Sequence, residues 1–349
     1  MAEAHILNSA HAKFLSCGSF ELNRIEEFER NLSEFLEVEN VIAVSNGSSA
    51  ILIALMAVGI SPGDEVIIPN RTWIATAHAI HILGAKVVIV DVEKDRPIID
   101  ASLIEEKVTL KTKAIIPVHM NGRSCDMKVI NTIAKKHRLF VIEDAAQAIA
   151  SRNSNGYLGV QSDMGCFSLS VAKTISTGQG GFVVTNNKDL AVKIRAIRTQ
   201  GVESVKDPKE WEMPGFNFRF NDILASIGLE QLKRLPERIK HLRKLYTEYE
   251  KGLKESEFDL IKVDLSIGEV PVYNEFLVRD RSQWIRKLQN LNIETRPFYP
   301  NISDARYLSK DNASYFNSVK YSKKGIYLPS GPNQEVKSAL KCIQYIIGN

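Results

Sequence analysis

An apolar run that ends in two carboxylates stands at residues 139–144, with the sequence Leu139-Phe140-Val141-Ile142-Glu143-Asp144. Other short runs rich in β-forming residues lie at 41–45, 65–69, 86–92, 113–118, 165–171 and 181–185. Helical patterns fit between several of them, notably at 49–58 and 127–137. Apolar strands separated by helices are typical of a mainly parallel sheet with helices on both faces. The sequence therefore predicts an α/β fold of this kind.

Three groups suited to one cofactor follow these strands. Asp144 ends the first run, and Lys173 lies between the run at 165–171 and the glycine-rich turn at 178–181. The stretch Asn46-Gly47-Ser48-Ser49 leads from another run into a helix. Parallel sheets bind ligands at the carboxyl ends of their strands, so we expect these groups to meet there. A reactive amine, a buried carboxylate and an anion cradle are the three anchors that pyridoxal phosphate needs.

The alternation of strands and helices stops near residue 220. A long amphipathic helical stretch follows at 221–254, and Pro236 interrupts it. The remaining chain has strand patterns around 271–278 and helical patterns near 281–291 and 334–347. We therefore expect a large cofactor-binding domain at residues 1–235 and a small α+β domain at residues 236–349.

Composition and charge exclude several classes of protein. The 349 residues are 44% hydrophobic and 25% charged, which is ordinary for a globular protein. The net charge of +4 is small for this length and calls for no nucleic-acid or membrane partner. The four cysteines are scattered without a CxxC pair, and no signal peptide or membrane span is evident. The sequence favours a cytoplasmic location.

Lys173 and Asp144 are the predicted catalytic residues. Lys173 would form a Schiff base with the cofactor aldehyde and later carry a proton, since burial lowers the pKa of an amine. Asp144 would keep the pyridine nitrogen protonated, and Gln147 would hydrogen-bond the phenolic oxygen. Each residue also has a structural interpretation: a lysine paired with a carboxylate, an aspartate capping a turn, and a polar residue at a helix start.

The cofactor phosphate is expected at the helix that follows residue 46. Free backbone N–H groups and the positive end of the helix dipole attract anions there, and we include Gly47, Ser48 and Ser49 in the site. Ser168 precedes the lysine closely enough to reach the same phosphate. Trp73 follows a strand and would stack on the pyridine ring. An ordinary helix cap and an aromatic core residue are the alternatives for the serines and for Trp73.

No metal site is expected. His78 and His81 are spaced for one face of a helix, but no third ligand is close in the sequence. His119 follows another strand, where a packed histidine is the simpler interpretation.

These motifs resemble those of the nucleotide-sugar aminotransferases of pyridoxal-phosphate fold type I. The resemblance covers nearly the whole chain. The matching segments are Ser45-Asn46-Gly47-Ser48-Ser49-Ala50, Pro62-Gly63-Asp64-Glu65-Val66-Ile67, Thr72-Trp73-Ile74-Ala75-Thr76-Ala77, Pro117-Val118-His119, Glu143-Asp144-Ala145-Ala146-Gln147-Ala148, the Lys173 segment, Gly215-Phe216-Asn217-Phe218-Arg219 and Glu294-Thr295-Arg296-Pro297-Phe298-Tyr299-Pro300.

The resemblance implies an activity and a set of partners. Such enzymes move an amino group from glutamate to a nucleotide-linked keto-deoxysugar, with pyridoxamine phosphate as the intermediate form of the cofactor. They supply amino sugars for surface polysaccharides such as the lipopolysaccharide O-antigen. They work as homodimers, in which Asn217 would reach the partner subunit's cofactor phosphate. Arg219, Arg296 and Tyr299 are the substrate-binding residues expected from the matching segments.

Two segments bear on the choice of substrate. Residues 294–300 and Leu328-Pro329-Ser330-Gly331-Pro332 look most like the GDP-perosamine synthase branch, which aminates a 4-keto-6-deoxymannose. Residues 18–23 match the family's sugar-binding stretch only loosely. Two other functions remain open: a sugar dehydratase, which carries histidine in place of the Schiff-base lysine, and a regulatory protein that binds the cofactor without turnover.

Overall fold

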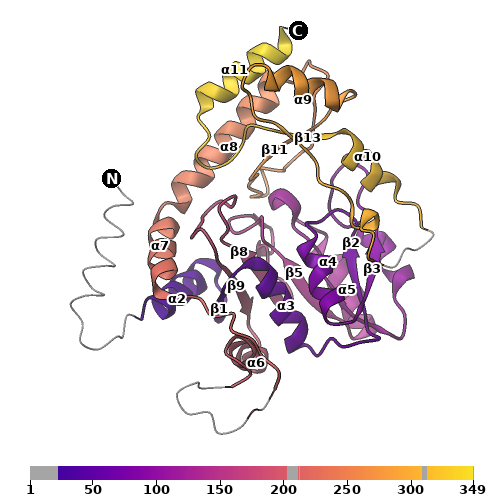
Figure 1. Cartoon of the computed structure of the whole chain (residues 1–349), viewed down its shortest axis with the longest axis vertical. Coiled ribbons are helices and arrows are strands. Elements are labelled where there is room, and N and C mark those ends of the chain that lie inside the picture. Colours follow the sequence, from indigo (N-terminus) through magenta and orange to yellow (C-terminus); the bar gives the residue numbers. More distant parts are fainter. Residues whose placement is uncertain (1–22, 203–210, 212, 309–312, 349) are drawn as a thin grey trace.

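The computed structural model describes residues 23–202, 211, 213–308 and 313–348, and residues 18–22 of the loosely matching stretch lie outside them. A seven-stranded sheet forms its centre, in the order β1-β9-β8-β5-β4-β2-β3 (Figure 1). The strands are β1 (Asn40–Val44), β2 (Glu65–Pro69), β3 (Lys86–Val90), β4 (Thr112–Ile115), β5 (Phe140–Asp144), β8 (Met164–Ser168) and β9 (Gly181–Thr185). Neighbouring strands from β3 to β8 run parallel, and β9 runs antiparallel to both of its neighbours. The predicted mainly parallel sheet is confirmed.

Helices cover both faces of this sheet. The helices of this part of the chain are α2 (Arg24–Leu36), α3 (Gly47–Ala57), α4 (Ala75–Ile82), α5 (Met127–His137), α6 (Lys188–Arg198) and α7 (Asp222–Lys233). Alternate strand residues face opposite sides: Ile42 packs with α3 and α6, whereas Val41 packs with α2 and α7. On the second face α5 covers β4 and β5. This alternation explains why the strands read as continuous apolar runs in the sequence.

Short helices and a small hairpin fill the connections. They are the 3-10 helices at Ala101–Leu103, Glu105–Lys107, Met120–Gly122 and Ile302–Asp304, and the hairpin of β6 (Arg152–Asn153) and β7 (Gly156–Tyr157). No helix in the described part of the chain combines the length and the apolar character needed to cross a membrane.

A second, antiparallel sheet forms after residue 258, in the order β10-β11-β13-β12. Its strands are β10 (Asp259–Leu260), β11 (Asn274–Leu277), β12 (Arg296–Pro297) and β13 (Gly325–Leu328). The helices beside it are α8 (Leu235–Gly252), α9 (Arg281–Gln289), α10 (Phe316–Lys324) and α11 (Val336–Ile347). Figure 1 shows this part above the large sheet, with α8 running along both.

Helix α8 contributes to two hydrophobic cores. Leu235 and Leu242 pack with the large sheet, whereas Leu245 and Tyr249 pack with β11, β13 and α11. Pro236 lies in the first turn of α8, where a missing N–H costs nothing, and separates α8 from α7. The predicted boundary between residues 235 and 236 therefore coincides with the start of a helix that both cores share, and it stays a prediction.

Several predicted boundaries were wrong, among them the strands expected at 86–92, 113–118 and 271–278, which are shorter. Two others bear on the site. The strand expected at 165–171 ends at Ser168: Leu169 still donates to the Gly180 carbonyl, but its own carbonyl accepts from the Thr177 N–H, which closes a turn over the residues between them. The helix expected at 49–58 begins at Gly47, because the side chain of Asn46 caps it by accepting a hydrogen bond from the Ser49 N–H at 2.8 Å.

Candidate active site

The carboxyl end of β5 presents Asp144, which is buried and held by two donors. One oxygen, Oδ2, accepts a hydrogen bond from the Thr76 hydroxyl at 2.9 Å, and Oδ1 accepts one from the Ala146 N–H at 3.1 Å. Burial raises the pKa of Asp144, while these donors and the charge of Lys173 act in the opposite direction. The carboxylate is thus fixed in orientation and faces the positive charge of the lysine.

Lys173 lies in the turn that follows β8. Its backbone N–H donates to the Ser170 carbonyl at 3.0 Å, and its side chain is half-buried. Burial lowers the pKa of the Lys173 amine, and the nearby Asp144 carboxylate opposes this shift. A lysine that loses its proton more readily than usual is suited to nucleophilic attack and proton transfer.

The N-terminus of α3 faces the same edge of the sheet. The Asn46 Oδ1 accepts two hydrogen bonds from Ser49, one from its backbone N–H and one from its hydroxyl at 3.1 Å. The N–H groups of Gly47 and Ser48 find no partner among the described residues, and Ser48 is exposed. These two N–H groups are therefore the ones available to an anion, whereas the Ser49 hydroxyl is buried and bonds within the cap.

Close packing brings this helix against β8 and β9. A Cβ atom at Gly47 would stand 2.8 Å from the Ser168 Cβ, and one at Gly181 would stand 2.5 Å from the Asn46 carbonyl carbon. Neither contact is possible for a real side chain, so both glycines are required by the close approach of the backbones. The result places Ser168 beside the free end of α3, where the sequence predicted a phosphate cradle.

Trp73 and Tyr299 meet over this edge. Trp73 is 59% exposed, and its ring meets that of Tyr299 edge to face with centroids 5.6 Å apart. The preceding Thr72 hydroxyl lies 2.9 Å from that of Thr76, which in turn holds Asp144. The Tyr299 hydroxyl donates to the Met120 Sδ at 3.0 Å. The Trp73 ring is thus exposed, and the residue before it belongs to the hydroxyl chain that leads to Asp144.

Gln147 is half-buried three residues after Asp144. Its Oε1 accepts a hydrogen bond from the Asn121 N–H at 2.8 Å. The opposite end of the amide, Nε2, has no partner among the described residues. Gln147 therefore presents a donor at this edge of the sheet.

Three of the predicted residues are exposed in the single chain. Asn217 and Arg219 are exposed and pair with each other, Arg219 Nε donating to Asn217 Oδ1 at 3.0 Å. Their loop is anchored beside α3, since the Ser45 N–H bonds to the Phe218 carbonyl at 2.9 Å. Arg296 is exposed on β12 and forms an ion pair with Glu294 at 2.6 Å. The structure thus ties the backbone of this loop to the start of α3 and leaves the Asn217 and Arg219 side chains paired with each other.

Sequence reasoning missed several residues that support the site. Thr76 bonds to Asp144, and Tyr273 donates its hydroxyl to the Ala172 carbonyl at 3.3 Å. The side chains of His119 and Glu143 are buried and lie 2.8 Å apart, and Glu143 also accepts hydrogen bonds from residues 159, 161 and 162. His119 is thus a packed histidine, as the simpler interpretation held. The spacing of the hydroxyls at residues 72 and 76 was the only local sign in the sequence that Thr76 supports the site.

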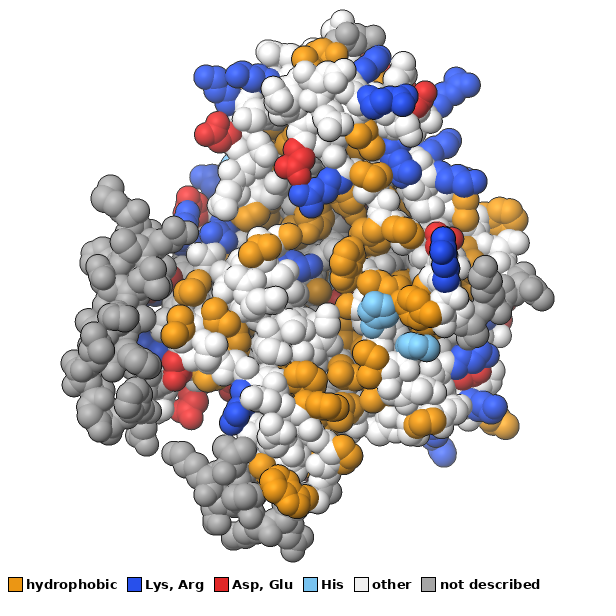
Figure 2. Space-filling view, viewed as in Figure 1, with side chains coloured by type: hydrophobic (Ala, Val, Ile, Leu, Met, Phe, Trp, Pro, Cys, Tyr) orange, Lys and Arg blue, Asp and Glu red, His pale blue; other side chains and the backbone are white. Residues whose placement is uncertain are grey.

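The surface around the site is hollowed and apolar. Figure 2 shows hydrophobic side chains gathered around a hollow between the large sheet and the C-terminal sheet.

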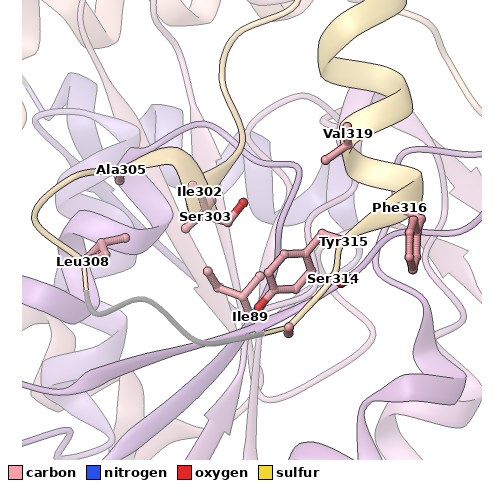
Figure 3. A pocket seen from close by; sticks show the side chains of 10 residues that line it. Ile89, Ile302, Ser303, Ala305, Leu308, Ser314, Tyr315, Phe316 and Val319 are labelled. Carbon is pink, nitrogen blue, oxygen red and sulfur yellow. The ribbon is translucent and has the colours of Figure 1, made fainter.

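A separate cavity of about 460 Å³ lies between residues 302–308 and 313–319 at the β3 side of the sheet. Its lining includes Ile89, Ile302, Tyr315 and Phe316, which Figure 3 shows around the opening. None of the predicted site residues lines this cavity.

Comparisons with known proteins agree with this fold. The model of the DegT/DnrJ/EryC1/StrS aminotransferase family matches residues 7–346. The GDP-perosamine synthase of Caulobacter vibrioides is 38% identical over 285 residues, which are 79% of this chain and 76% of that protein. DesV of S. venezuelae, solved in complex with a ketimine intermediate, has a TM-score of 0.91 at 29% identity and covers 98% of this chain and 93% of its own. NtdA of Bacillus subtilis, solved with bound cofactor PMP, has a TM-score of 0.89 at 29% identity, covering 99% of this chain and 81% of its own.

The fold is that of aminotransferases. The chain belongs to the DegT/DnrJ/EryC1/StrS aminotransferase family. The predicted family and the predicted enzyme class, a sugar aminotransferase, are confirmed.

Proposed function

We propose that this chain binds pyridoxal phosphate through Lys173 and uses it to aminate a nucleotide-linked keto sugar. The observation that supports the proposal is geometric: Asp144 ends β5, the neighbouring strand β8 ends at Ser168 shortly before Lys173, and Ser168 packs against Gly47 at the start of α3. When bound, the cofactor supplies an electron sink for the carbon from which a proton is removed. Every other part of the chemistry falls to side chains of this chain.

The residues present fit the cofactor at each of its polar groups. The N–H groups of Gly47 and Ser48, with the Ser168 hydroxyl beside them, would hold the phosphate. Asp144 would hold the proton of the pyridine nitrogen, and Gln147 would donate to the phenolic oxygen. We assign the exposed ring of Trp73 to one face of the pyridine.

Lys173 has two roles in this proposal. It would hold the cofactor covalently before reaction, and its free amine would then move a proton at the reacting carbon. Positioned acid–base catalysis of this kind contributes about 10²–10⁴-fold. The lowered pKa of the amine favours both roles, because only the unprotonated amine attacks a carbonyl or accepts a proton.

We propose glutamate as amino donor and a nucleotide-linked 4-keto-6-deoxyhexose as acceptor. The similarity to the GDP-perosamine synthase of Caulobacter vibrioides supports this branch, as do the segments at 294–300 and 328–332. Arg296 and Tyr299 would bind the substrate from the C-terminal part of the chain. The product would be an amino sugar for a surface polysaccharide such as an O-antigen.

The proposed enzyme is a homodimer. Asn217 and Arg219 are exposed and pair with each other. In a dimer, Asn217 would reach the cofactor phosphate of the partner, and Arg219 would bind substrate at the interface. The family resemblance of the 215–219 loop supports this arrangement.

Absorbance spectroscopy tests the proposal. Purified protein mixed with pyridoxal phosphate is expected to form a coloured adduct, and glutamate alone should convert it to the pyridoxamine form. Turnover is then measured against a panel of nucleotide-linked keto sugars. A spectrum that glutamate leaves unchanged would indicate a binding protein without turnover, and sugar deoxygenation without a stable amino sugar would indicate a dehydratase. Either result overturns the proposal.

A further inference from the structure

Asn121 lies in the turn after β4 and connects Gln147 to the C-terminal part of the chain. It is fully buried and adopts the left-handed conformation, with φ of 55° and ψ of 35°. Its N–H donates to the Gln147 Oε1 at 2.8 Å. A backbone N–H can only donate, so the atom of the Gln147 amide that faces it must be the oxygen. The amide nitrogen of Gln147 is therefore left as the free end.

The Asn121 side chain is itself held by four hydrogen bonds to one segment. Its Oδ1 accepts from the N–H groups of Val272 at 2.8 Å and Tyr273 at 2.7 Å. Its Nδ2 donates to the Tyr273 carbonyl at 2.9 Å and to the Glu275 Oε2 at 3.0 Å. This side chain thus has a single orientation, which fixes the left-handed turn and the direction of the Asn121 N–H.

A buried ion pair supports the same segment. Glu275 pairs with Arg123 at 2.5 Å, and both side chains are inaccessible to solvent or nearly so. Arg123 also donates to the carbonyl groups of Ile261 and Lys262, 138 and 139 residues farther along the chain. The turn that carries Asn121 is therefore clamped between the two sheets.

We propose that Asn121 is a positioning residue, which holds the Gln147 amide so that its NH₂ group donates to the phenolic oxygen of the cofactor. This inference rests on the proposed function. Asn121 touches neither cofactor nor substrate in this scheme and acts only through Gln147.

A donor at the phenolic oxygen has a measurable consequence. The donor stabilises negative charge on the phenolic oxygen. That oxygen then attracts the proton of the cofactor–lysine linkage less strongly. Removing the donor should raise the pH at which the bound chromophore loses its proton by about one unit. Asp144, His119 and Glu275 also lie near this turn, and the variants below leave all three unchanged.

The experiment compares Asn121→Gly, Gln147→Glu and the double variant by pH titration of the bound chromophore and by the Kd of pyridoxal phosphate. Glycine keeps the left-handed turn accessible but removes all four side-chain hydrogen bonds. Glutamate still accepts from the Asn121 N–H but has no donor at its free end. Each single variant is expected to raise the titration midpoint and to weaken cofactor binding about tenfold. The double variant should match Gln147→Glu alone, because Asn121 acts through Gln147.

Asn274→Ala is the matched control. Asn274 is buried in β11 and donates to the Pro329 carbonyl at 3.3 Å, so its loss affects stability without touching Gln147. It should lower the melting temperature and leave the midpoint unchanged. If the glycine variant does not fold, Asn121→Ser replaces it. Serine retains a hydroxyl acceptor, so the titration midpoint should shift in the same direction by a smaller amount.

The outcomes separate this inference from the proposed function. A midpoint that Gln147→Glu raises and the Asn121 variants leave unchanged would overturn the role of Asn121 alone. Additive shifts in the double variant would overturn it as well. A wild-type protein that forms no chromophore would instead overturn the proposed function.

Discussion

The Thr76 hydroxyl donates a hydrogen bond of 2.9 Å to the buried carboxylate of Asp144. Thr76 lies on α4 and Asp144 ends β5, and two strands separate these elements in the sequence. This contact fixes one carboxylate oxygen while the Ala146 N–H fixes the other. The remaining lone pairs of Asp144 are thus oriented before any ligand binds. Such preorganisation lowers the cost of holding a proton at a fixed position.

Thr76→Val should therefore impair activity without unfolding the protein. Valine keeps the shape of the side chain but leaves the carboxylate with one donor fewer, and a hydrogen bond to a charged group is worth about 1.5–3 kcal/mol. We expect kcat to fall about tenfold or more. Steady-state kinetics check this, with Thr112→Val as the control, since Thr112 is also buried but its hydroxyl accepts from the Thr109 N–H and does not bond to Asp144. Equal losses in both variants would contradict the role given to Thr76.

Lys173→Ala should reduce turnover by about 10³-fold or more, because both the covalent attachment and the proton carrier are lost. Lys173→Arg is the matched control: it keeps a positive charge beside Asp144 but offers no amine that can form the linkage. Mass spectrometry after borohydride reduction should find the cofactor on residue 173 of the wild-type protein only. Wild-type turnover in either variant would refute the assignment.

Gly47→Val should weaken the binding of the cofactor phosphate. A Cβ at this position would stand 2.8 Å from Ser168, so α3 must move away from β8 to admit it. We expect the Kd of pyridoxal phosphate to rise about tenfold or more, since a charged hydrogen-bonding site is lost. Pyridoxal, which lacks the phosphate, is the matched ligand, and its Kd should change little. Parallel losses for both ligands would mean that the substitution acts elsewhere.

Stability of the cofactor-free protein should depend on pH through Lys173. Burial lowers the pKa of this amine below its ordinary value of 10.5, so in the window between the two values the unfolded chain binds more protons than the folded one. The free energy of unfolding contributed by this group therefore rises as pH increases through that window. Urea denaturation should show this rise in the wild type and not in Lys173→Met. The same slope in both proteins would contradict it.

The sequence predicted the parts of the site that follow directly from a strand or a helix. Asp144 ends an apolar run, and the stretch at 46–49 begins a helix, so local pattern alone placed them at one edge of the sheet. The lysine was harder to place. Leu169, Ser170 and Val171 favour a strand, but the chain turns because Leu169 bonds to Gly180 and Thr177. Local β-propensity gave way there to hydrogen bonds made farther along the chain.

Contacts between distant segments could not be read from the pattern. Asn121 meets Tyr273 across more than 150 residues, and Thr76 meets Asp144 across 68. Polar residues in turns have many possible partners, and periodicity says nothing about which one is chosen. The loop at residues 215–219 is a different case. The family resemblance gave Asn217 and Arg219 a role at a partner subunit, and a single chain has no partner against which to test it.

The reversed direction of β9 has a consequence for the loop that carries Lys173. Because β9 runs antiparallel to β8, Ser168 and Gly181 pair at the same edge of the sheet, and the loop at 169–180 begins and ends there. The amine therefore hangs from two neighbouring strands of the central sheet, and both ends of its loop are fixed by the scaffold that keeps the chain folded.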